Sequence, residues 1–211
     1  ANGGSAASIS INENTSSVAD VDATDVDIND PDTLTYSISG GADSALFTID
    51  ASTGALSFIT APDYETPQDA GSDNIYDVQV QVSDGYPGTP GTDTQDFSVT
   101  VNDVNEPPEI TSGAGLSATD VNVLENQTAA TDVDAQDEDL PAQSLTYSII
   151  GGADSSFFTI DAATGALNFL TAPDYETPLD ANTNNAYRVK VRVSDGALTD
   201  EQDITVIVGN V

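Results

Sequence analysis

The stretch IYDVQVQVS, residues 75–83, alternates apolar and polar side chains with a period of two. This period is typical of a β-strand that buries one face, because successive side chains point to opposite sides of the strand. The same alternation occurs in Leu34–Ile38 and in Phe97–Val101. No segment of the chain keeps the 3.6-residue period of an amphipathic helix. The sequence therefore predicts an all-β protein.

The whole neighbourhood of this stretch occurs twice in the chain. LTYSISGGADSALFTIDASTGALSFITAPDYETPQDA (Leu34–Ala70) returns 111 residues later as LTYSIIGGADSSFFTIDAATGALNFLTAPDYETPLDA (Leu145–Ala181). YDVQVQVSDG returns as YRVKVRVSDG, and the two copies meet at VNDVNEPPEI (Val101–Ile110). A copy of about a hundred residues has the size of a domain. We expect two domains, residues 1–106 (repeat 1) and residues 107–211 (repeat 2).

Each repeat contains about seven short strand-like segments, separated by clusters of Gly, Pro, Asn and Asp that favour turns. This spacing favours a two-sheet antiparallel sandwich. The Cys, Trp and Cys pattern of true immunoglobulin domains is absent. The predicted fold is two tandem immunoglobulin-like Greek-key β-sandwiches, joined end to end.

The chain is very acidic, with 36 Asp and Glu residues against 3 Lys and Arg residues, no His and a formal charge of −33. This charge disfavours nucleic acid and anionic membranes as partners. No apolar run approaches the ~20 residues of a membrane-spanning helix, and no signal peptide is visible. The ends of the sequence coincide with repeat boundaries, so we expect a monomeric segment of a longer array of repeats.

The carboxylates gather where strands end. Each repeat has a Glu near its start, a D-x-D pair, a D-Y-E triplet and an Asp after the long valine strand. Alternate residues of an extended segment face the same way, so each D-x-D or D-x-E motif aims two carboxylates at one point. Ca²⁺ takes six to eight oxygen ligands. Zinc and copper are poor candidates because the chain has neither His nor Cys.

The calcium-binding motifs of cadherin repeats resemble the order of acidic motifs in this chain, which is Glu, D-x-D, D-x-E, V-S-D-G and D-V-N-E-P-P. The cadherin-like repeats of bacterial surface proteins resemble it in the short sequences LTYSI, GGAD and TGAL. This resemblance covers nearly all of the chain. It implies two or three Ca²⁺ ions at the junction of the repeats. The ligands that it implies are Glu13, Asp63, Glu65, the carbonyl of Val104, Asn105, Glu106, Asp137, Asp139 and Asp195, with Asp103 nearby.

The remaining motif residues would be half-sites for neighbouring repeats. Asp25, Asp27 and Asp84 would lie at one end of the segment, and Glu125, Asp174 and Glu176 at the other. The D-R-E arginine of the family is replaced by Tyr64 and Tyr175, which leaves the carboxylates in place. The tryptophan exchange of vertebrate adhesive cadherins is excluded because the chain has no Trp.

The resemblance implies a calcium-binding extender or adhesion module of a bacterial cell-surface or secreted protein, whose partners are neighbouring repeats of the same chain. The alternative is a calcium-dependent module that binds polysaccharide or another cadherin-like surface. Tyr86 is the one aromatic residue that we expect to be exposed for such binding. Catalysis is not expected, because no His and no cleft-forming insertion is present.

Arg188, Lys190 and Arg192 are the only cations, and they share one face of one predicted strand. One interpretation is a solvated strand face that offsets nearby acid. The other is a small patch for an anionic ligand. The sequence leaves both open.

Overall fold

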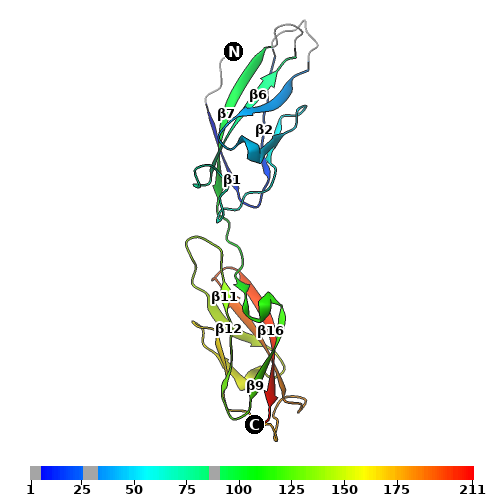
Figure 1. Ribbon diagram of the computed structural model, residues 1–211, viewed down its shortest axis with the longest axis vertical. Helices are drawn as coiled ribbons and strands as arrows, with labels where there is room; N and C mark the ends of the chain where they lie inside the picture. The colour runs from blue at the N-terminus through cyan, green and yellow to red at the C-terminus, as the bar shows by residue number, and fades with distance from the viewer. Residues whose placement is uncertain (1–5, 26–32, 86–90) are drawn as a thin grey trace. The chain divides into compact units, whose positions relative to one another are not determined.

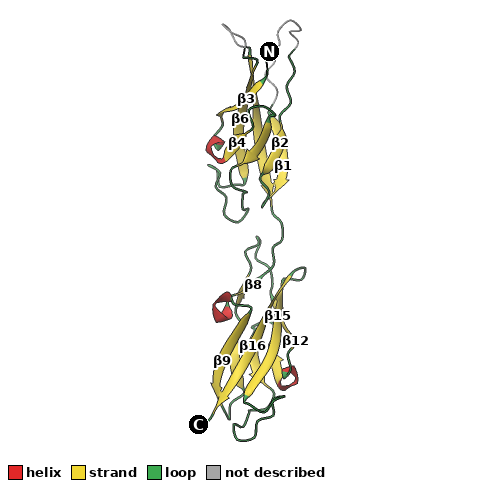
Figure 2. Cartoon of the chain, turned by 90° about the vertical axis from the view of Figure 1, so that its right-hand side faces the viewer, coloured by secondary structure: helices red, strands yellow, loops and turns green. Residues whose placement is uncertain are grey.

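The computed structural model describes residues 6–25, 33–85 and 91–211. The chain forms two compact units, Ala1–Val104 and Asn105–Val211, and Figures 1 and 2 draw both. The division falls two residues before the one expected from the sequence. Within the described ranges, no helix is long and apolar enough to cross a membrane. Tyr86 and Asp27 lie outside the described residues.

Repeat 1 is a sandwich of two sheets. The larger sheet has the order β1-β7-β6-β3 and the smaller has the order β2-β5-β4. A short 3-10 turn, η1 (Ser44–Leu46), precedes β4. The strands are β1 (Ala7–Asn12), β2 (Ser17–Asp20), β3 (Thr35–Gly40), β4 (Phe47–Ile49), β5 (Ala55–Phe58), β6 (Ile75–Ser83) and β7 (Thr92–Asn102).

Repeat 2 has the same two sheets, with the orders β12-β15-β16-β9 and β10-β14-β13, and an additional two-stranded sheet, β11-β8. Its 3-10 turns are η2 (Ser112–Gly115) and η3 (Ser155–Phe157). The strands are β8 (Glu109–Ile110), β9 (Ala118–Leu124), β10 (Ala129–Asp132), β11 (Ala135–Gln136), β12 (Thr146–Gly151), β13 (Phe158–Ile160), β14 (Ala166–Phe169), β15 (Ala186–Ser194) and β16 (Thr199–Gly209).

The prediction of two all-β sandwiches is confirmed, with one difference in strand direction. β1 pairs in parallel with β7, and β9 pairs in parallel with β16, whereas the sequence suggested antiparallel sheets throughout. In each larger sheet the earliest and the last strand therefore run the same way, and the chain enters this sheet at one end of the sandwich and leaves it at the other. Figure 1 shows β1 beside β7 in repeat 1.

The predicted alternation of residues 75–83 is confirmed in β6, where Tyr76, Val78 and Val80 are at most 2 % exposed. Tyr76 meets Phe58 edge-on, with 5.0 Å between ring centroids. Repeat 2 has the same contact between Tyr187 and Phe169, at 5.2 Å. Aromatic pairs of this geometry stabilise a core beyond their buried area. The inner face that the two copies share is therefore the hydrophobic core, and the acidic motifs lie at the ends of its strands.

Candidate metal centre

Three carboxylates of repeat 1 converge at the end of its last strand. Glu13, Glu65 and Asp103 each offer an oxygen, and these oxygens lie within 4.8 Å of one another. We call this set the Glu13 cluster. Glu13 follows β1, Asp103 follows β7 and Glu65 lies in the loop after β5. The parallel pairing of β1 with β7 brings the first two together, because Asn12 and Asn102 are partners in the register.

Glu13 is the fixed point of this cluster. Its side chain is 3 % exposed. One carboxylate oxygen, Oε2, accepts the N–H of Tyr64 at 2.8 Å, and the other, Oε1, accepts the N–H of Val104 at 2.8 Å. A single buried carboxylate thus ties the D-Y-E loop and the start of the linker to the end of β1. Buried charges require such charge-assisted hydrogen bonds.

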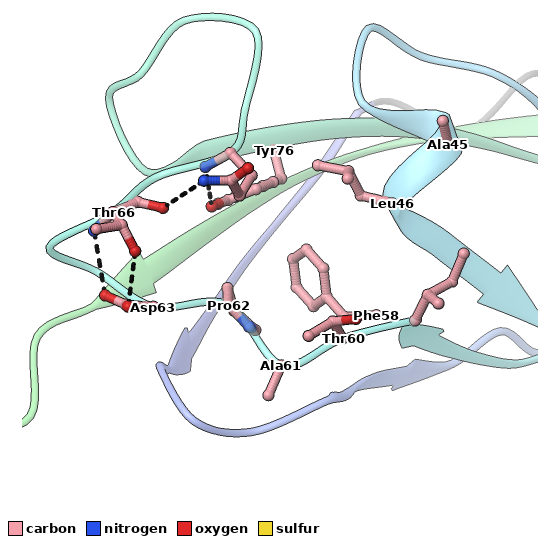
Figure 3. A pocket seen from close by; sticks show the side chains of 11 residues that line it. Ala45, Leu46, Phe58, Thr60, Ala61, Pro62, Asp63, Thr66 and Tyr76 are labelled. Atoms are coloured by element: carbon pink, nitrogen blue, oxygen red, sulfur yellow. Dashed lines mark hydrogen bonds between the residues drawn. The ribbon is translucent and has the colours of Figure 1, made fainter.

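Within the described part of the chain, Asp63 does not belong to the Glu13 cluster. Its Oδ1 accepts the N–H groups of Glu65 at 3.0 Å and Thr66 at 3.1 Å, and its Oδ2 accepts the Thr66 hydroxyl at 2.7 Å (Figure 3). The expected extended backbone of D-Y-E is wrong, but its two carboxylates do converge in the second copy, where Asp174 and Glu176 lie in one cluster. Residues 64–66 are bends, and Asp63 caps the turn that places Glu65, as Asp side chains commonly do.

Figure 3 also shows a pocket of about 540 Å³ beside this turn, with Leu46, Phe58 and Tyr76 on its apolar side. The same position in repeat 2 carries Phe157 in place of Leu46, and the Phe157 ring meets Tyr187 edge-on at 5.7 Å. The larger side chain therefore occupies the space beside the tyrosine in repeat 2.

The chemistry of Glu65 indicates that its charge lacks compensation from the protein. Its Oε1 is buried and has no hydrogen-bond partner among the described residues. Burial and the neighbouring carboxylates of Glu13, Asp103 and Asp63 raise the pKa of Glu65 to about 7, although a backbone hydrogen bond partly opposes them. Such a shift records the cost of a carboxylate in this place without a positive charge.

A second cluster lies in repeat 2, where Asp137, Asp139 and Asp195 each offer an oxygen within 4.8 Å of the others. We call it the Asp137 cluster. The D-x-D pair follows β11, and Asp195 follows β15. Asp139 is 2 % exposed, and its backbone N–H donates to Asp137 Oδ1 at 3.2 Å.

The linker residues Asn105 and Glu106 bind to this second cluster. The Asn105 amide donates to Asp195 Oδ2 at 2.8 Å, and the Glu106 N–H donates to Asp139 Oδ1 at 3.2 Å. Hydrogen bonds from Ala197 and Asn105 hold the pKa of Asp195 below its ordinary value. The linker thus supplies donors to the outer edge of the cluster and leaves other carboxylate oxygens facing one another.

Asp137 has the same unsatisfied character as Glu65. Its Oδ2 is buried and accepts no hydrogen bond from any residue that the structure describes. Burial raises the pKa of Asp137, and the charges of Asp139 and Asp195 add to the rise.

The sequence reasoning missed Gln143, whose side-chain amide donates to Asn105 Oδ1 at 2.8 Å and to Asp139 Oδ2 at 2.9 Å. Gln143 lies in EDLPAQSL, which is one residue shorter than the matching VDINDPDTL of repeat 1. This length difference between otherwise matching copies was the available signal. Gln143 is a positioning residue that joins the linker to the D-x-D pair.

A third cluster groups the half-site residues Glu125, Asp174 and Glu176 of repeat 2 within the same 4.8 Å limit. It repeats the Glu13 cluster in its backbone contacts, since Glu125 accepts the N–H of Tyr175 at 3.1 Å and of Val211 at 3.2 Å. Asn210 stands where repeat 1 has Asp103 and donates to Glu176 at 2.8 Å. Of the other half-site residues, Asp84 accepts the N–H of Gly91 at 2.9 Å.

The donor sets fit a hard cation. Each cluster offers only oxygen ligands, and in the first two a buried carboxylate oxygen lacks a hydrogen-bond donor within the described ranges. A divalent cation with oxygen preference would satisfy these atoms and cancel the repulsion that raises the pKa values of Glu65 and Asp137.

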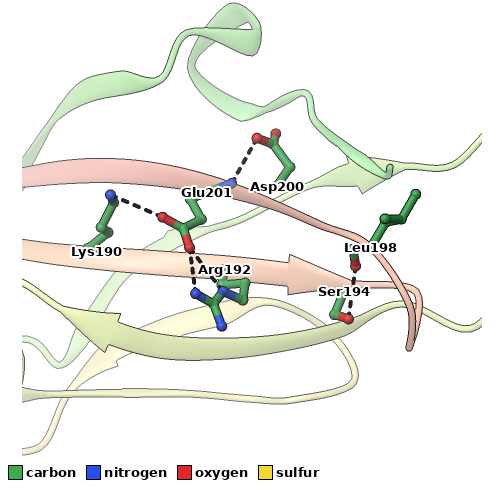
Figure 4. Close-up of polar contacts among 6 residues, drawn as sticks. All are labelled: Lys190, Arg192, Ser194, Leu198, Asp200 and Glu201. Atoms are coloured by element: carbon green, nitrogen blue, oxygen red, sulfur yellow. Dashed lines mark hydrogen bonds and ion pairs between the residues drawn. The ribbon is translucent and has the colours of Figure 1, made fainter. Parts of the chain in front are cut away.

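The basic strand is compensated within its own sheet. Lys190 Nζ lies 3.1 Å from Glu201 Oε2, and Arg192 donates to Glu201 Oε1 through Nε at 3.1 Å and Nη2 at 2.6 Å (Figure 4). Glu201 lies on β16, which pairs with β15. Arg188 faces Thr205 in the register. These contacts favour the interpretation of a strand face that offsets nearby acid over that of an anion-binding patch.

A sequence model of the family described as "Cadherin domain" matches residues 7–102 and 119–209. These two matches cover most of the chain and coincide with the two sandwiches. The chain belongs to the cadherin domain family. Cadherin domains are extracellular, adhesion-type modules that occur in tandem, and the family is a structural one.

Several curated proteins resemble the chain. Human Protocadherin Fat 1 is 33 % identical over 165 residues, which are 77 % of this chain and 3 % of that protein. Halomucin of Haloquadratum walsbyi is 36 % identical over 97 residues, which are 43 % of this chain and 1 % of that protein. The chain therefore spans a few per cent of the length of these curated relatives.

Solved cadherin structures share the fold. Drosophila N-cadherin EC1-4 has a TM-score of 0.62 at 19 % identity, and the match covers 97 % of this chain and 49 % of that one. Human Protocadherin-24 EC1-2 has a TM-score of 0.58 at 21 % identity, with 97 % and 95 % covered. The assignment of the chain to tandem cadherin repeats thus agrees in sequence and in fold.

Proposed function

We propose that this pair of cadherin repeats is a calcium-dependent extender of an exported surface protein. In this proposal, two or three Ca²⁺ ions bind the carboxylates at the linker and stiffen the connection between the repeats. The proposed ligands are those that the sequence indicated: Glu13, Asp63, Glu65, Asp103, the Val104 carbonyl, Asn105, Glu106, Asp137, Asp139 and Asp195.

The observation that carries the proposal is the pair of buried carboxylate oxygens, Glu65 Oε1 and Asp137 Oδ2, which find no donor in the part of the chain that the structure describes. A buried charged oxygen without a partner costs free energy. Each stands in a cluster of three carboxylates, one on either side of the linker in the sequence. A bound cation would remove this free-energy cost, which gives a physical reason for the presence of the acidic motifs in both repeats.

The roles of the other ligands follow from their contacts. Asp63 caps the turn that positions Glu65. Its main effect on the proposed ion is therefore to hold the Glu65 carboxylate in place. Glu13 accepts the N–H of Val104 and so holds it beside the end of β1. This contact uses the N–H of Val104, and its carbonyl is the proposed linker ligand. Asn105 and Gln143 orient Asp195 and Asp139.

The bacterial surface origin is part of the proposal. The repeat wording LTYSI, GGAD and TGAL supports it, as does the similarity to a haloarchaeal halomucin. Animal cadherins such as Protocadherin Fat 1 match a larger share of the chain, and the family alone is compatible with either origin.

Polysaccharide binding gains less support from the surface. Tyr175, at 38 % exposed, is the one aromatic side chain among the large exposed apolar residues of the described ranges. Sugar-binding platforms commonly present several aromatic faces, so we propose no glycan site. Neighbouring repeats remain the proposed partners.

Small-angle X-ray scattering across a calcium titration tests the proposal, with magnesium at the same ionic strength as the control. We expect calcium to narrow the distance distribution to that of a single extended arrangement and magnesium to leave it broad. Glu65→Gln and Asp137→Asn should weaken the calcium response, whereas Asp132→Asn, an exposed residue of β10, should keep it. A distribution that is the same with and without calcium in the folded protein would sink the proposal.

A further inference from the structure

The pocket beside the D-Y-E turn of repeat 1 is lined by residues of that repeat alone. Its volume of about 540 Å³ lies within the range of small-molecule sites, which is about 300–1,000 Å³. Figure 3 shows Leu46 and Phe58 on one side of the space and Pro62 and Thr66 on the other. Phe58 and Tyr76 are 4 % and 1 % exposed, so rings of the hydrophobic core form the inner wall.

Hydrogen bonds hold the walls of this pocket in place. The carbonyl of Pro62 accepts the N–H of Asn14 at 2.8 Å, which fixes the segment after β5 against the end of β1. The N–H of Gln68 donates to the Tyr76 hydroxyl at 3.2 Å, which fixes the rim against the core. The pocket is therefore formed without a ligand, and a ligand loses little free energy in shaping it.

Repeat 2 has the same backbone frame at this place. The carbonyl of Pro173 accepts the N–H of Asn126 at 3.0 Å, and the N–H of Leu179 donates to the Tyr187 hydroxyl at 3.1 Å. Seven of the eleven lining positions carry the same residue in both repeats. The four pairs that differ are Ala45 and Ser156, Leu46 and Phe157, Ile59 and Leu170, and Gln68 and Leu179. Side chains, and not the backbone, therefore distinguish the two copies.

The aromatic ring of repeat 2 indicates which group the pocket of repeat 1 fits. Phe157 packs edge-on against Tyr187, with 5.7 Å between ring centroids. Leu46 stands at this position in repeat 1 and has no ring. Within the described part of the chain, the Tyr76 ring meets only Phe58, at 5.0 Å. Contacts between rings stabilise beyond their buried area, and a ligand ring beside Leu46 supplies the contact that repeat 1 lacks.

Polar groups at the rim select the rest of the ligand. The Gln68 amide donates to the carbonyl of Thr66 at 2.9 Å, and no described residue donates to its Oε1. The hydroxyl of Thr60 likewise has no partner in the described ranges. Asp63 lines the same pocket, and the chain carries a formal charge of −33. The rim thus offers hydrogen bonds to a polar substituent and repels an anion.

We propose that this pocket binds a small molecule with one aromatic ring and a hydrogen-bonding substituent that is not an anion. The ring lies between Leu46 and Pro62, and the substituent donates to Gln68 Oε1. In repeat 2 the Phe157 side chain takes the place of the ligand. The carboxylate clusters contribute no group to these contacts, so binding does not require calcium.

A nuclear magnetic resonance titration of the full chain with benzyl alcohol, in chelator, tests the proposal. We expect saturable shifts of the amide signals of Ile59, Thr60 and Gln68, with a dissociation constant of about 1 mM. The signals of their counterparts in repeat 2 should not move. Cyclohexylmethanol, which lacks the aromatic ring, and phenylacetate, which is an anion, are the matched control ligands. Each should bind at least about fivefold more weakly than benzyl alcohol.

Exchanging one residue between the repeats makes the test reciprocal. Leu46→Phe should weaken binding by about tenfold or more, because the added ring fills the space. Phe157→Leu should create a second site that shifts the signals of Leu170 and Leu179, and this site should be the weaker one because it lacks the amide of Gln68. Signals remote from the pocket report the folding of each variant. If Leu46→Phe does not fold, Phe157→Leu still decides the question.

A titration without saturable shifts in repeat 1, equal binding of either control ligand, or a site in repeat 2 of the wild type would overturn the proposal. So would pocket signals that depend on protein concentration without benzyl alcohol, because a second copy of the chain would then occupy the pocket. All of these measurements are made in chelator, so a failure of the calcium proposal in the scattering experiment would leave them unaffected.

Discussion

The carboxylates of Asp43 and Asp154 lie inside their repeats, where they are 5 % and 2 % exposed. Asp43 accepts the N–H groups of Ala70 at 2.7 Å and Asp77 at 2.8 Å. Asp154 does the same for Ala181 and Arg188. These residues end the GGAD turns, which therefore hold the long loop against β6 and β15. Part of the acidity of this chain is internal and structural.

Replacing Asp43 by Ala should destabilise repeat 1 by about 2–4 kcal/mol, because two backbone donors lose a charged acceptor at a buried place. The loss should be equal in calcium and in chelator, since Asp43 is not in any of the carboxylate clusters. Urea unfolding measures it, with the exposed Asp132→Ala as the matched control. A change below about 1 kcal/mol, or one seen only with calcium, would contradict the structural role.

Asp69 predicts a pH dependence of stability. Burial alone would raise the pKa of Asp69, but the backbone N–H groups of Asp73 and Asn74, both at 3.1 Å, outweigh it and hold that pKa below 3.8. A folded-state pKa below the unfolded one contributes stability above the unfolded value, and this stability is lost as the pH falls through the folded value. The free energy of unfolding, measured with urea in the presence of chelator, should therefore fall more steeply between pH 5 and pH 3 in the wild type than in Asp69→Asn. Parallel slopes would refute this assignment.

At the scale of elements, the sequence predicted strands better than loops. Alternation identified β6 with its bounds, because a strand with one buried face must alternate. It did not reveal that β1 pairs in parallel with β7, since side-chain period is the same in both directions. It placed Asp63 and Glu65 on an extended segment, whereas residues 64–66 form bends that Asp63 caps. Such turns depend on local hydrogen bonds that a period does not encode.

The close approach of the GGAD turn to β6 gives a prediction about Gly41. This residue has a φ of 103°, and a Cβ there would lie 2.5 Å from the Cα of Val78. Gly41→Ala should cost about 3 kcal/mol or more, because backbone strain and overpacking add. Gly85→Ala is the control, since Gly85 has a φ of 72° and, apart from its chain neighbours, no atom of the described residues lies within 4 Å of its Cβ position. Gly85→Ala should lower the free energy of unfolding in urea by about 1–2 kcal/mol. Equal losses in Gly41→Ala and Gly85→Ala would show that the close approach of Gly41 to β6 does not cause the destabilisation.

For the whole molecule, a formal charge of −33 opposes folding through self-repulsion, and the Lys190 and Arg192 contacts with Glu201 are too few to offset it. Monovalent salt should screen the exposed acids evenly in both repeats. A specific cation acts differently, because it favours the places where carboxylates already converge. The distinction between screening and binding can therefore be made repeat by repeat.

Calcium should stabilise both repeats, by about 2.7 kcal/mol at a hundredfold excess over the dissociation constant. Hydrogen exchange by mass spectrometry, at fixed ionic strength, locates this gain along the chain. Glu65→Gln removes one charge of the Glu13 cluster, and Asp137→Asn removes one of the Asp137 cluster, so each variant should reduce the gain. Asp132→Asn should leave the gain intact.

The pattern of the loss also decides whether the ions are shared. A reduction confined to the mutated repeat means that each cluster binds its own ion, whereas a reduction in both repeats from either variant means that the linker ions hold both clusters together. An equal gain with magnesium, or an undiminished calcium gain in both variants, would show that the carboxylates respond to ionic strength alone. The shared pattern is the one we expect, because Glu13 holds Val104 and Asp139 holds Glu106, only two positions further along the linker.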